Sequence, residues 1–159
     1  MTPTTTAAPL PSLESALGQP NYQLRVTYSR ASDLHMEVWQ LPAVATPDLV
    51  KPLRLGGLGG RHLALIEERV LQQLARSRVK LGKVLPHKPQ VYSLTEEVAL
   101  RLGLIFRVLA PMRSRDKMMA CVMGIEEMGQ EEAAYWLGMA LHHQNPRRVL
   151  AALRLLLQE

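Results

Sequence analysis

Hydrophobic and polar residues alternate along two stretches near the start of the chain. In the first stretch one face carries Tyr22, Leu24, Val26 and Tyr28. The alternation resumes over residues 34–39 after four turn-forming residues, so the two stretches predict a β-hairpin. Its strands are expected to pair Arg25 with Glu37. Since an isolated hairpin is marginally stable in water, its apolar face must pack on other elements.

The chain after residue 60 has helical periodicity. Apolar residues recur at helical spacing from about Arg61 to Val79, and the capping box Ser93-Leu94-Thr95-Glu96 starts a second helix near Leu94. This second helix is apolar nearly all round from Val98 to Leu109, which predicts a place in the centre of the core. Three more helices are predicted over about 114–128, 130–143 and 145–157. The predicted class is α+β, with an N-terminal β-hairpin packed on a bundle of about five α-helices.

The remaining segments are interpreted from their composition. Residues 1–20 are rich in Thr, Pro, Ala and Ser, with Glu14 as their only charge, and they predict a flexible tail. The prolines of residues 42–52 limit further strand pairing to Val50–Leu55 at best. We interpret the glycines of residues 55–60 as a turn or hinge before the first long helix. One α+β domain is expected over residues 21–159, with the hairpin and its connection in 21–60 and the helical part in 61–159.

Composition excludes several classes of protein. The chain has 159 residues, of which 47% are hydrophobic and 21% charged, as in ordinary globular proteins. Its single cysteine, Cys121, excludes an intramolecular disulfide framework and a cysteine-rich zinc site. The longest apolar run, Leu102–Ala110, is shorter than the roughly 20 residues of a membrane span, and the N-terminus lacks the features of a secretory signal. We expect a cytoplasmic protein with no membrane contact, no metal and no cofactor.

The stretch Leu104–Leu157 contains the segments RSRDKMMACVMGIEEMGQEEAAYWLGMALHH and RRVLAALRLLL, and it resembles a family of small uncharacterised bacterial proteins. The predicted hairpin and glycine-rich turn fit that family's layout, so the resemblance covers most of the chain after the tail. The family has no known activity, and the resemblance therefore implies no catalytic or binding residue. It implies a link to phage-defence gene clusters, which slightly favours a complex that handles nucleic acid.

The net charge of +5 comes from one stretch, residues 61–95, where seven basic residues stand against Glu67 and Glu68. Helical steps separate Arg69, Gln73, Arg76 and Lys80. This spacing predicts one solvent-facing stripe opposite Leu63 and Ile66. A stripe of this kind suits a phosphate backbone, whose charge it neutralises. The residues expected to contact nucleic acid are Arg69, Arg76, Arg78, Lys80, Lys83 and Lys88.

Other interpretations of the basic stretch stay open. A solvated helix face that only aids solubility is one alternative, and contact with an acidic protein partner is another. Since Tyr92 is the only aromatic residue of the stretch, stacking with several bases is not available. Sequence-specific recognition of a nucleic acid is therefore not expected.

Two further features predict contacts with protein. Trp39 and Leu41 fall on the hairpin face opposite Met36 and Val38, where a partly exposed tryptophan is expected at an interface. The edge of the hairpin can also accept a partner strand. Five methionines and two aromatic residues are expected to form a core contact between two helices, with a surface for a partner helix as the alternative. They are Met118, Met119, Met123, Met128, Tyr135, Trp136 and Met139.

We expect no catalytic residue, because no nucleophile has an obvious base: Ser114 stands between two arginines, and Cys121 is expected to be buried. The favoured function is a non-enzymatic accessory subunit of a larger bacterial assembly that contacts nucleic-acid phosphates without sequence specificity. The alternative is a protein–protein interaction module that uses the hairpin edge and the Met-rich helices. A protein partner is expected in either case, with DNA or RNA backbone and a second copy of the chain as further candidate partners.

Overall fold

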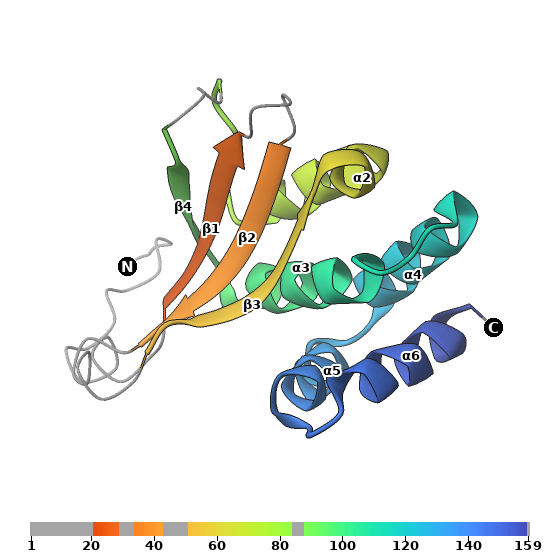
Figure 1. The fold of residues 1–159 in the computed structure, drawn as a ribbon. Helices are drawn as coiled ribbons and strands as arrows, with labels where there is room; N and C mark the ends of the chain where they lie inside the picture. The colour runs from red at the N-terminus through yellow and green to blue at the C-terminus, as the bar shows by residue number, and fades with distance from the viewer. Residues whose placement is uncertain (1–20, 29–33, 43–50, 84–87, 159) are drawn as a thin grey trace, which may run out of the picture.

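The computed structural model describes residues 21–28, 34–42, 51–83 and 88–158 (Figure 1). The predicted tail, residues 1–20, lies outside these ranges. Four strands form one antiparallel sheet in the order β3-β2-β1-β4. They are β1 (Asn21–Tyr28), β2 (Leu34–Leu41), β3 (Leu53–Gly59) and β4 (Gln90–Leu94). The predicted hairpin is the β1–β2 pair, and it forms the middle of the sheet.

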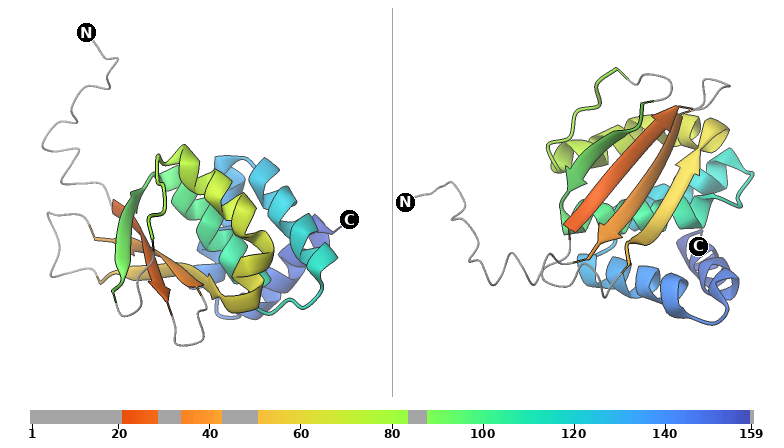
Figure 2. Two further views of the ribbon diagram at one scale, coloured as in Figure 1. Left: turned by 90° about the horizontal axis from the view of Figure 1, so that it is seen from above. Right: turned by 60° about the vertical axis from the view of Figure 1, so that its left-hand side comes forward.

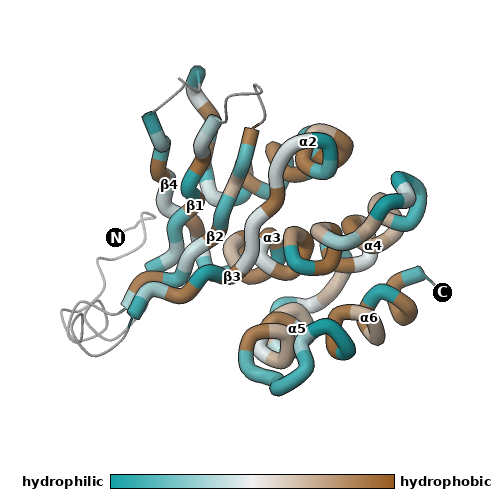
Figure 3. The backbone as a smooth tube through the Cα atoms, viewed as in Figure 1, coloured by the Kyte–Doolittle hydropathy of each residue, from teal (hydrophilic) through white to brown (hydrophobic). Residues whose placement is uncertain are grey.

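Helices in the described residues complete an α+β fold, so the predicted class is confirmed. They are α2 (Gly60–Arg76), α3 (Glu96–Leu109), α4 (Arg115–Glu127), α5 (Gln130–His142) and α6 (Pro146–Leu157). Figure 2 shows all of them on one side of the sheet, with α2 and α3 against it. No described helix covers the opposite face. Along β1 and β2 hydrophilic and hydrophobic residues alternate (Figure 3), as expected of a sheet with one buried face.

α3 lies at the centre of the helical layer, as its hydrophobicity all round predicts. It packs against β1, β2, β3 and every other described helix. The helix begins two residues later than predicted, because Thr95 and not Ser93 is the N-cap. The Thr95 hydroxyl accepts a hydrogen bond from the Val98 backbone N–H at 3.4 Å. Ser93 belongs instead to β4, a strand of five residues that the sequence pattern did not predict.

The glycines before α2 form a strand, so the predicted hinge is wrong. Gly56, Gly57 and Gly59 belong to β3, and only Gly60 has a positive φ, of 59°, where the chain turns into α2. A Cβ on Gly56 would collide with the carbonyl oxygen of Gly103 in α3. The backbones of strand and helix touch at this crossing, and glycine is what lets them approach. The sequence pattern misses this role because α3 follows much later in the chain.

β3 carries a bulge that the side chain of Arg107 stabilises. The pairing with β2 shifts between Val38 and Trp39, so that Leu55 has no partner in the register. Arg107 in α3 donates through Nη2 to the carbonyl oxygen of Arg54 at 2.9 Å and through Nε to that of Leu55. Burial and the nearby charge of Arg54 lower the pKa of Arg107. The bulge fixes the direction in which the Arg54 side chain leaves the strand.

Candidate functional site

Two of the six cations predicted to contact nucleic acid are engaged in ion pairs within the protein. Arg69 donates to Oε1 of Glu126 through Nε at 3.0 Å and through Nη2 at 2.6 Å. Arg76 is paired with Glu97. Gln73, which lies between them, is 6% exposed. The predicted solvent-facing stripe is therefore wrong, because this flank of α2 lies against carboxylates of α3 and α4 that follow it in the sequence.

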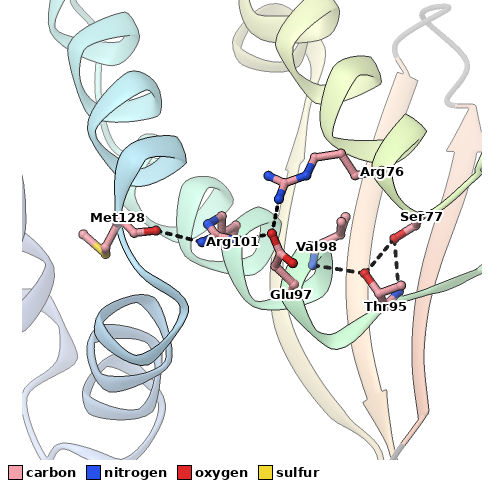
Figure 4. Close-up of polar contacts among 7 residues, drawn as sticks. All are labelled: Arg76, Ser77, Thr95, Glu97, Val98, Arg101 and Met128. Atoms are coloured by element: carbon pink, nitrogen blue, oxygen red, sulfur yellow. Dashed lines mark hydrogen bonds and ion pairs between the residues drawn. The ribbon is translucent and has the colours of Figure 1, made fainter.

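The Arg76–Glu97 pair is part of a larger network of polar contacts between helices (Figure 4). Glu97 also accepts a hydrogen bond from Nη1 of Arg101 at 2.8 Å, and Nη2 of Arg101 donates to the carbonyl oxygen of Met128 at 2.8 Å. Arg101 is 7% exposed. The network joins the end of α2 to α3 and to the start of the α4–α5 connection. Glu97 neutralises positive charge of Arg76 and Arg101 that would otherwise attract a phosphate. We therefore interpret the network as a structural contact between helices.

The other four predicted cations belong to the described parts of the connection between α2 and β4. Arg78, Lys80, Lys83 and Lys88 are exposed, and no ion pair with another described residue engages them. α2 ends at Arg76, so Lys80 does not continue a helical stripe. The connection is held beside β4 by side chains of that strand. Gln90 donates to the carbonyl oxygen of Lys83 at 2.7 Å, and the Tyr92 hydroxyl accepts from the Gly82 N–H at 3.3 Å.

A second candidate surface is the helix-free face of the sheet, the face that no described helix covers (Figure 2). Trp39 lies on this face as predicted, since it alternates along β2 with the buried Met36 and Val38. The expected Arg25–Glu37 ion pair is not formed, although the two residues are direct partners in the register. The Arg25 guanidinium lies instead over the Trp39 ring, with Cζ 4.5 Å from the centroid. This is the geometry of a cation–π interaction.

Glu37 has other partners on the same face. Its carboxylate accepts hydrogen bonds from Nε of Arg54 at 2.9 Å and from Nε1 of Trp39 at 3.2 Å, and His35 Nε2 lies 3.7 Å away. Burial alone would raise the pKa of Glu37, but hydrogen bonds from Arg54 and Trp39 and the charges of Arg54 and His35 outweigh it and lower that pKa. Glu37 therefore stays ionised at neutral pH and fixes its neighbours.

Two glycines of β3 make room for this arrangement. A Cβ on Gly57 would collide with Nη2 of Arg54, and a Cβ on Gly59 would lie 2.5 Å from Nδ1 of His35. Arg54 and His35 therefore lie flat across β3 on their way to Glu37. Sequence analysis identified neither residue as part of a site, because no local signal shows that Arg54 and His35 converge on Glu37, although Arg54 lies in the stretch Val50–Leu55 where a strand was allowed.

The predicted free edge of the hairpin does not exist. β1 pairs with β4 and β2 pairs with β3, so both hairpin strands are internal. The sheet edges belong to β3, where Arg107 binds two carbonyl oxygens, and to β4. Val91 of β4 is 54% exposed and lies beside Arg25 in the register. Any strand added by a partner would have to pair with one of these outer strands.

The Met-rich helices contribute partly to the core. Met118 and Met128 are buried, whereas Met123 and Tyr135 are exposed. α4 and α5 both pack on α3 rather than chiefly on each other, so the expected core contact between the two helices is wrong. α3 occupies the space between them because it is apolar on all sides. The Trp136 ring meets Tyr135 edge-on, with centroids 5.6 Å apart.

The two residues considered as nucleophiles, Cys121 and Ser114, both have structural positions in the fold. Cys121 is buried as expected, and burial raises the pKa of its thiol, which disfavours the reactive thiolate. Ser114 is the N-cap of α4 and accepts from the Lys117 N–H. Among the described residues, no three His, Cys, Asp or Glu side chains gather closely enough to hold a metal ion. None of the described helices has the length and hydrophobicity needed to cross a bilayer.

Comparison with known proteins gives one match. A family model described as a domain of unknown function (DUF7680) matches residues 22–159. No curated protein matches the chain, and no solved structure matches it. The matched residues begin in β1 and include every strand and helix described above. The sheet, the helical layer and both candidate surfaces are therefore parts of the family domain.

Proposed function

We propose that this chain, which belongs to the DUF7680 family of unknown function, is a non-enzymatic accessory subunit. In this proposal it binds a protein partner on the helix-free face of its sheet, around Trp39. The connection between α2 and β4 is a second, weaker candidate surface. The larger assembly is cytoplasmic and bacterial in this proposal, and the resemblance described above adds a setting in phage defence.

The arrangement of Arg25 and Trp39 carries the proposal. Arg25 lies over the ring, 4.5 Å from its centroid, and has no ion pair with a described residue. Glu37 beside it is occupied by Arg54 and Trp39. The guanidinium therefore keeps its N–H groups for a ligand. Arginine and tryptophan are the residues that most often dominate the binding energy of protein interfaces.

The chemistry of the surface indicates the kind of partner. A carboxylate of the partner would complete the hydrogen bonding of Arg25, because a planar guanidinium binds a carboxylate with two parallel hydrogen bonds. An apolar side chain would fit beside Val91, which is 54% exposed. The strands that carry Arg25 and Trp39 are hydrogen-bonded to neighbouring strands on both sides, so this part of the surface needs little reorganisation to bind. We therefore expect a partner segment with acidic and apolar side chains.

Affinity purification from a lysate of the native host tests this role. The bait proteins are the wild type, Trp39→Ala and Arg25→Glu, with Arg147→Glu as the matched control for a charge reversal at an exposed arginine of α6. Quantitative mass spectrometry is expected to find a partner that both sheet variants lose by about tenfold or more. The control keeps that partner. Recovery of the same proteins with all four baits contradicts the proposal.

Nucleic-acid contact is the second candidate function, supported by the four exposed cations Arg78, Lys80, Lys83 and Lys88. Fluorescence anisotropy with labelled single-stranded DNA or RNA of about 20 nucleotides measures this binding. The logarithm of Kd is expected to vary linearly with the logarithm of the salt concentration. Lys80→Glu/Lys83→Glu is expected to lower that slope by roughly two, one for each cation removed. Arg147→Glu/Arg148→Glu on α6 serves as the control. Absence of binding at low salt rules out this candidate.

A further inference from the structure

A groove lies between the first turns of α2 and the connection from α3 to α4, two segments that are side by side in Figures 1 and 2. Its volume is about 680 Å³. The α2 side carries Arg61, His62 and Leu65, and the opposite side carries Met112, Arg113 and Met118. A hydrogen bond of 2.6 Å between His62 Nε2 and the Met112 carbonyl oxygen fixes the two sides relative to each other.

The groove is lined by two arginines, Arg61 and Arg113. Arg61 and Arg113 are exposed, and neither forms an ion pair with a described residue. No carboxylate is among the residues that line the groove. By contrast, Arg54, Arg69, Arg101 and Arg107 all donate hydrogen bonds to oxygen atoms of the protein. The groove is therefore lined by two arginines whose side chains form no ion pair with the described residues around them.

The start of α2 adds to the positive potential. Its N-cap, Gly59, has no side chain to accept from the first backbone N–H groups, and the first turn holds no acidic residue. A helix N-terminus corresponds to roughly half a positive charge. His62 donates its Nε2 proton to Met112, because a carbonyl oxygen can only accept. The cationic character thus comes from two guanidinium groups, with the helix end as a smaller contribution.

The floor of the same groove is apolar. Met112 and Met118 are buried beneath it, and Ala64 and Leu65 form one wall, with Leu65 40% exposed. Apolar surface of this kind is expected to gain free energy when a ligand covers it. A small inorganic ion would use the arginines and leave this surface in water. The lining therefore suits a molecule with an anionic group at one end and an apolar body at the other.

We infer that the groove binds a small organic phosphate monoester. Its phosphate, which carries nearly two negative charges at neutral pH, lies between Arg61 and Arg113. Its apolar body covers Ala64 and Leu65. Two guanidinium groups match the charge of the dianion and supply paired N–H donors to its oxygens. This site is separate from the helix-free face of the sheet and does not depend on the partner proposed for that face.

Titration of the whole chain with phenyl phosphate tests the inference. Isothermal calorimetry is expected to give saturable binding with a Kd of about 1 mM or tighter. Inorganic phosphate and phenol, which each carry only half of the ligand's chemistry, are expected to bind at least about tenfold more weakly. In ¹H–¹⁵N spectra, the amide signals that move with phenyl phosphate should include those of residues 60–65 and 112–114.

Two double variants identify the site. Arg61→Ala/Arg113→Ala is expected to raise the Kd for phenyl phosphate about tenfold or more. Arg147→Ala/Arg148→Ala removes two exposed cations of α6 and is expected to leave the Kd unchanged. All four replaced side chains are exposed, so circular dichroism should show folded proteins of similar thermal stability.

Three results would overturn the inference. One is the absence of saturable binding of phenyl phosphate by the wild type. A second is an equal loss of affinity in both double variants, which would indicate general attraction by the basic protein. The third is equal binding of phenol and phenyl phosphate, which would show an apolar groove without an anion site. Loss of phenyl phosphate binding in the groove variant alone supports the inference.

Discussion

Gly56 of β3 and Gly103 of α3 approach so closely that a Cβ on the first would collide with the carbonyl oxygen of the second. This contact brings the central helix against an outer strand of the sheet. It explains why a glycine-rich segment lies in a strand, where glycine costs backbone entropy. The same strand carries Arg54 to the helix-free face, so the glycine contact supports one of the candidate surfaces.

Gly103→Ala is expected to destabilise the protein by about 2 kcal/mol or more, because its Cβ would lie 2.9 Å from the Cβ of Leu55. Gly138→Ala is the matched control, since Gly138 lies inside α5 and a Cβ there meets no atom within 4 Å. Alanine is the better helix former by about 1 kcal/mol, so this control is expected to stabilise. Urea unfolding measures both. Effects of the same sign at the two positions would contradict the close contact.

Arg101 and Arg76 bind the same carboxylate, Glu97, from sites of different burial. Arg101→Met is expected to cost about 1–3 kcal/mol, because it leaves the buried Met128 carbonyl oxygen without its hydrogen bond. Arg76→Met is expected to cost less than about 1 kcal/mol, since Arg76 is 49% exposed. Chemical denaturation of the two variants provides the comparison. A larger loss for Arg76→Met would show that the network is misassigned.

Tyr22 links stability to alkaline pH. Burial, together with the charge of Glu96 and a hydrogen bond to it, raises the pKa of Tyr22 from 10.0 to about 12. The folded state thus holds the phenol proton more tightly, and this contribution to stability is complete below pH 10 and lost as the pH rises toward 12. Absorbance titration at alkaline pH should show one tyrosine that ionises late. Tyr22→Phe should remove that transition, and its persistence would assign it to another tyrosine.

Glu37 links stability to acidic pH with the opposite sign. Its pKa is lowered in the folded protein, so the contribution is present above the ordinary pKa of a glutamate and disappears as the pH falls through the lowered value. Unfolding measured from neutral to acidic pH should lose stability less steeply in Glu37→Gln than in the wild type. Glu127→Gln, at an exposed glutamate without an ion pair to a described residue, is the control and should behave as the wild type.

Local periodicity was sufficient for much of the fold. The alternation of Leu24 and Val26 with Arg25 predicted β1 and its buried face, and the all-round hydrophobicity of Val98–Leu109 predicted a central helix. Of the two outer strands, β4 was not predicted, and β3 was predicted only as far as Leu55. β3 contains glycines that disfavour strands unless a neighbouring backbone needs the space, and β4 is five residues long and follows Pro89. Neither carries a repeated pattern long enough to stand out from a loop.

Candidate sites were harder to predict than elements. Trp39 was expected on an open face and lies there, but its partners Arg25, Glu37 and Arg54 were not foreseen as a group. The prediction of a solvent-facing basic stripe was wrong, because helical periodicity indicates which residues share a face of a helix but not which other elements pack against that face. Glu126 lies 57 positions after Arg69, and only the packing of both α2 and α4 on α3 brings them together.

Hydrophobic spacing, helix caps and turn residues act over a few positions, so the amino-acid order alone determined the α+β class, the central place of α3 and the buried Cys121. Tertiary structure decided the strand order and left the hairpin without a free edge. It also decided the ion pairs that Arg69 and Arg76 form with glutamates, and it placed Arg61 and Arg113 in one groove. These features depend on which distant segments share a core. Charge and hydrogen bonding act through space, and the distances they depend on exist only once the chain has folded.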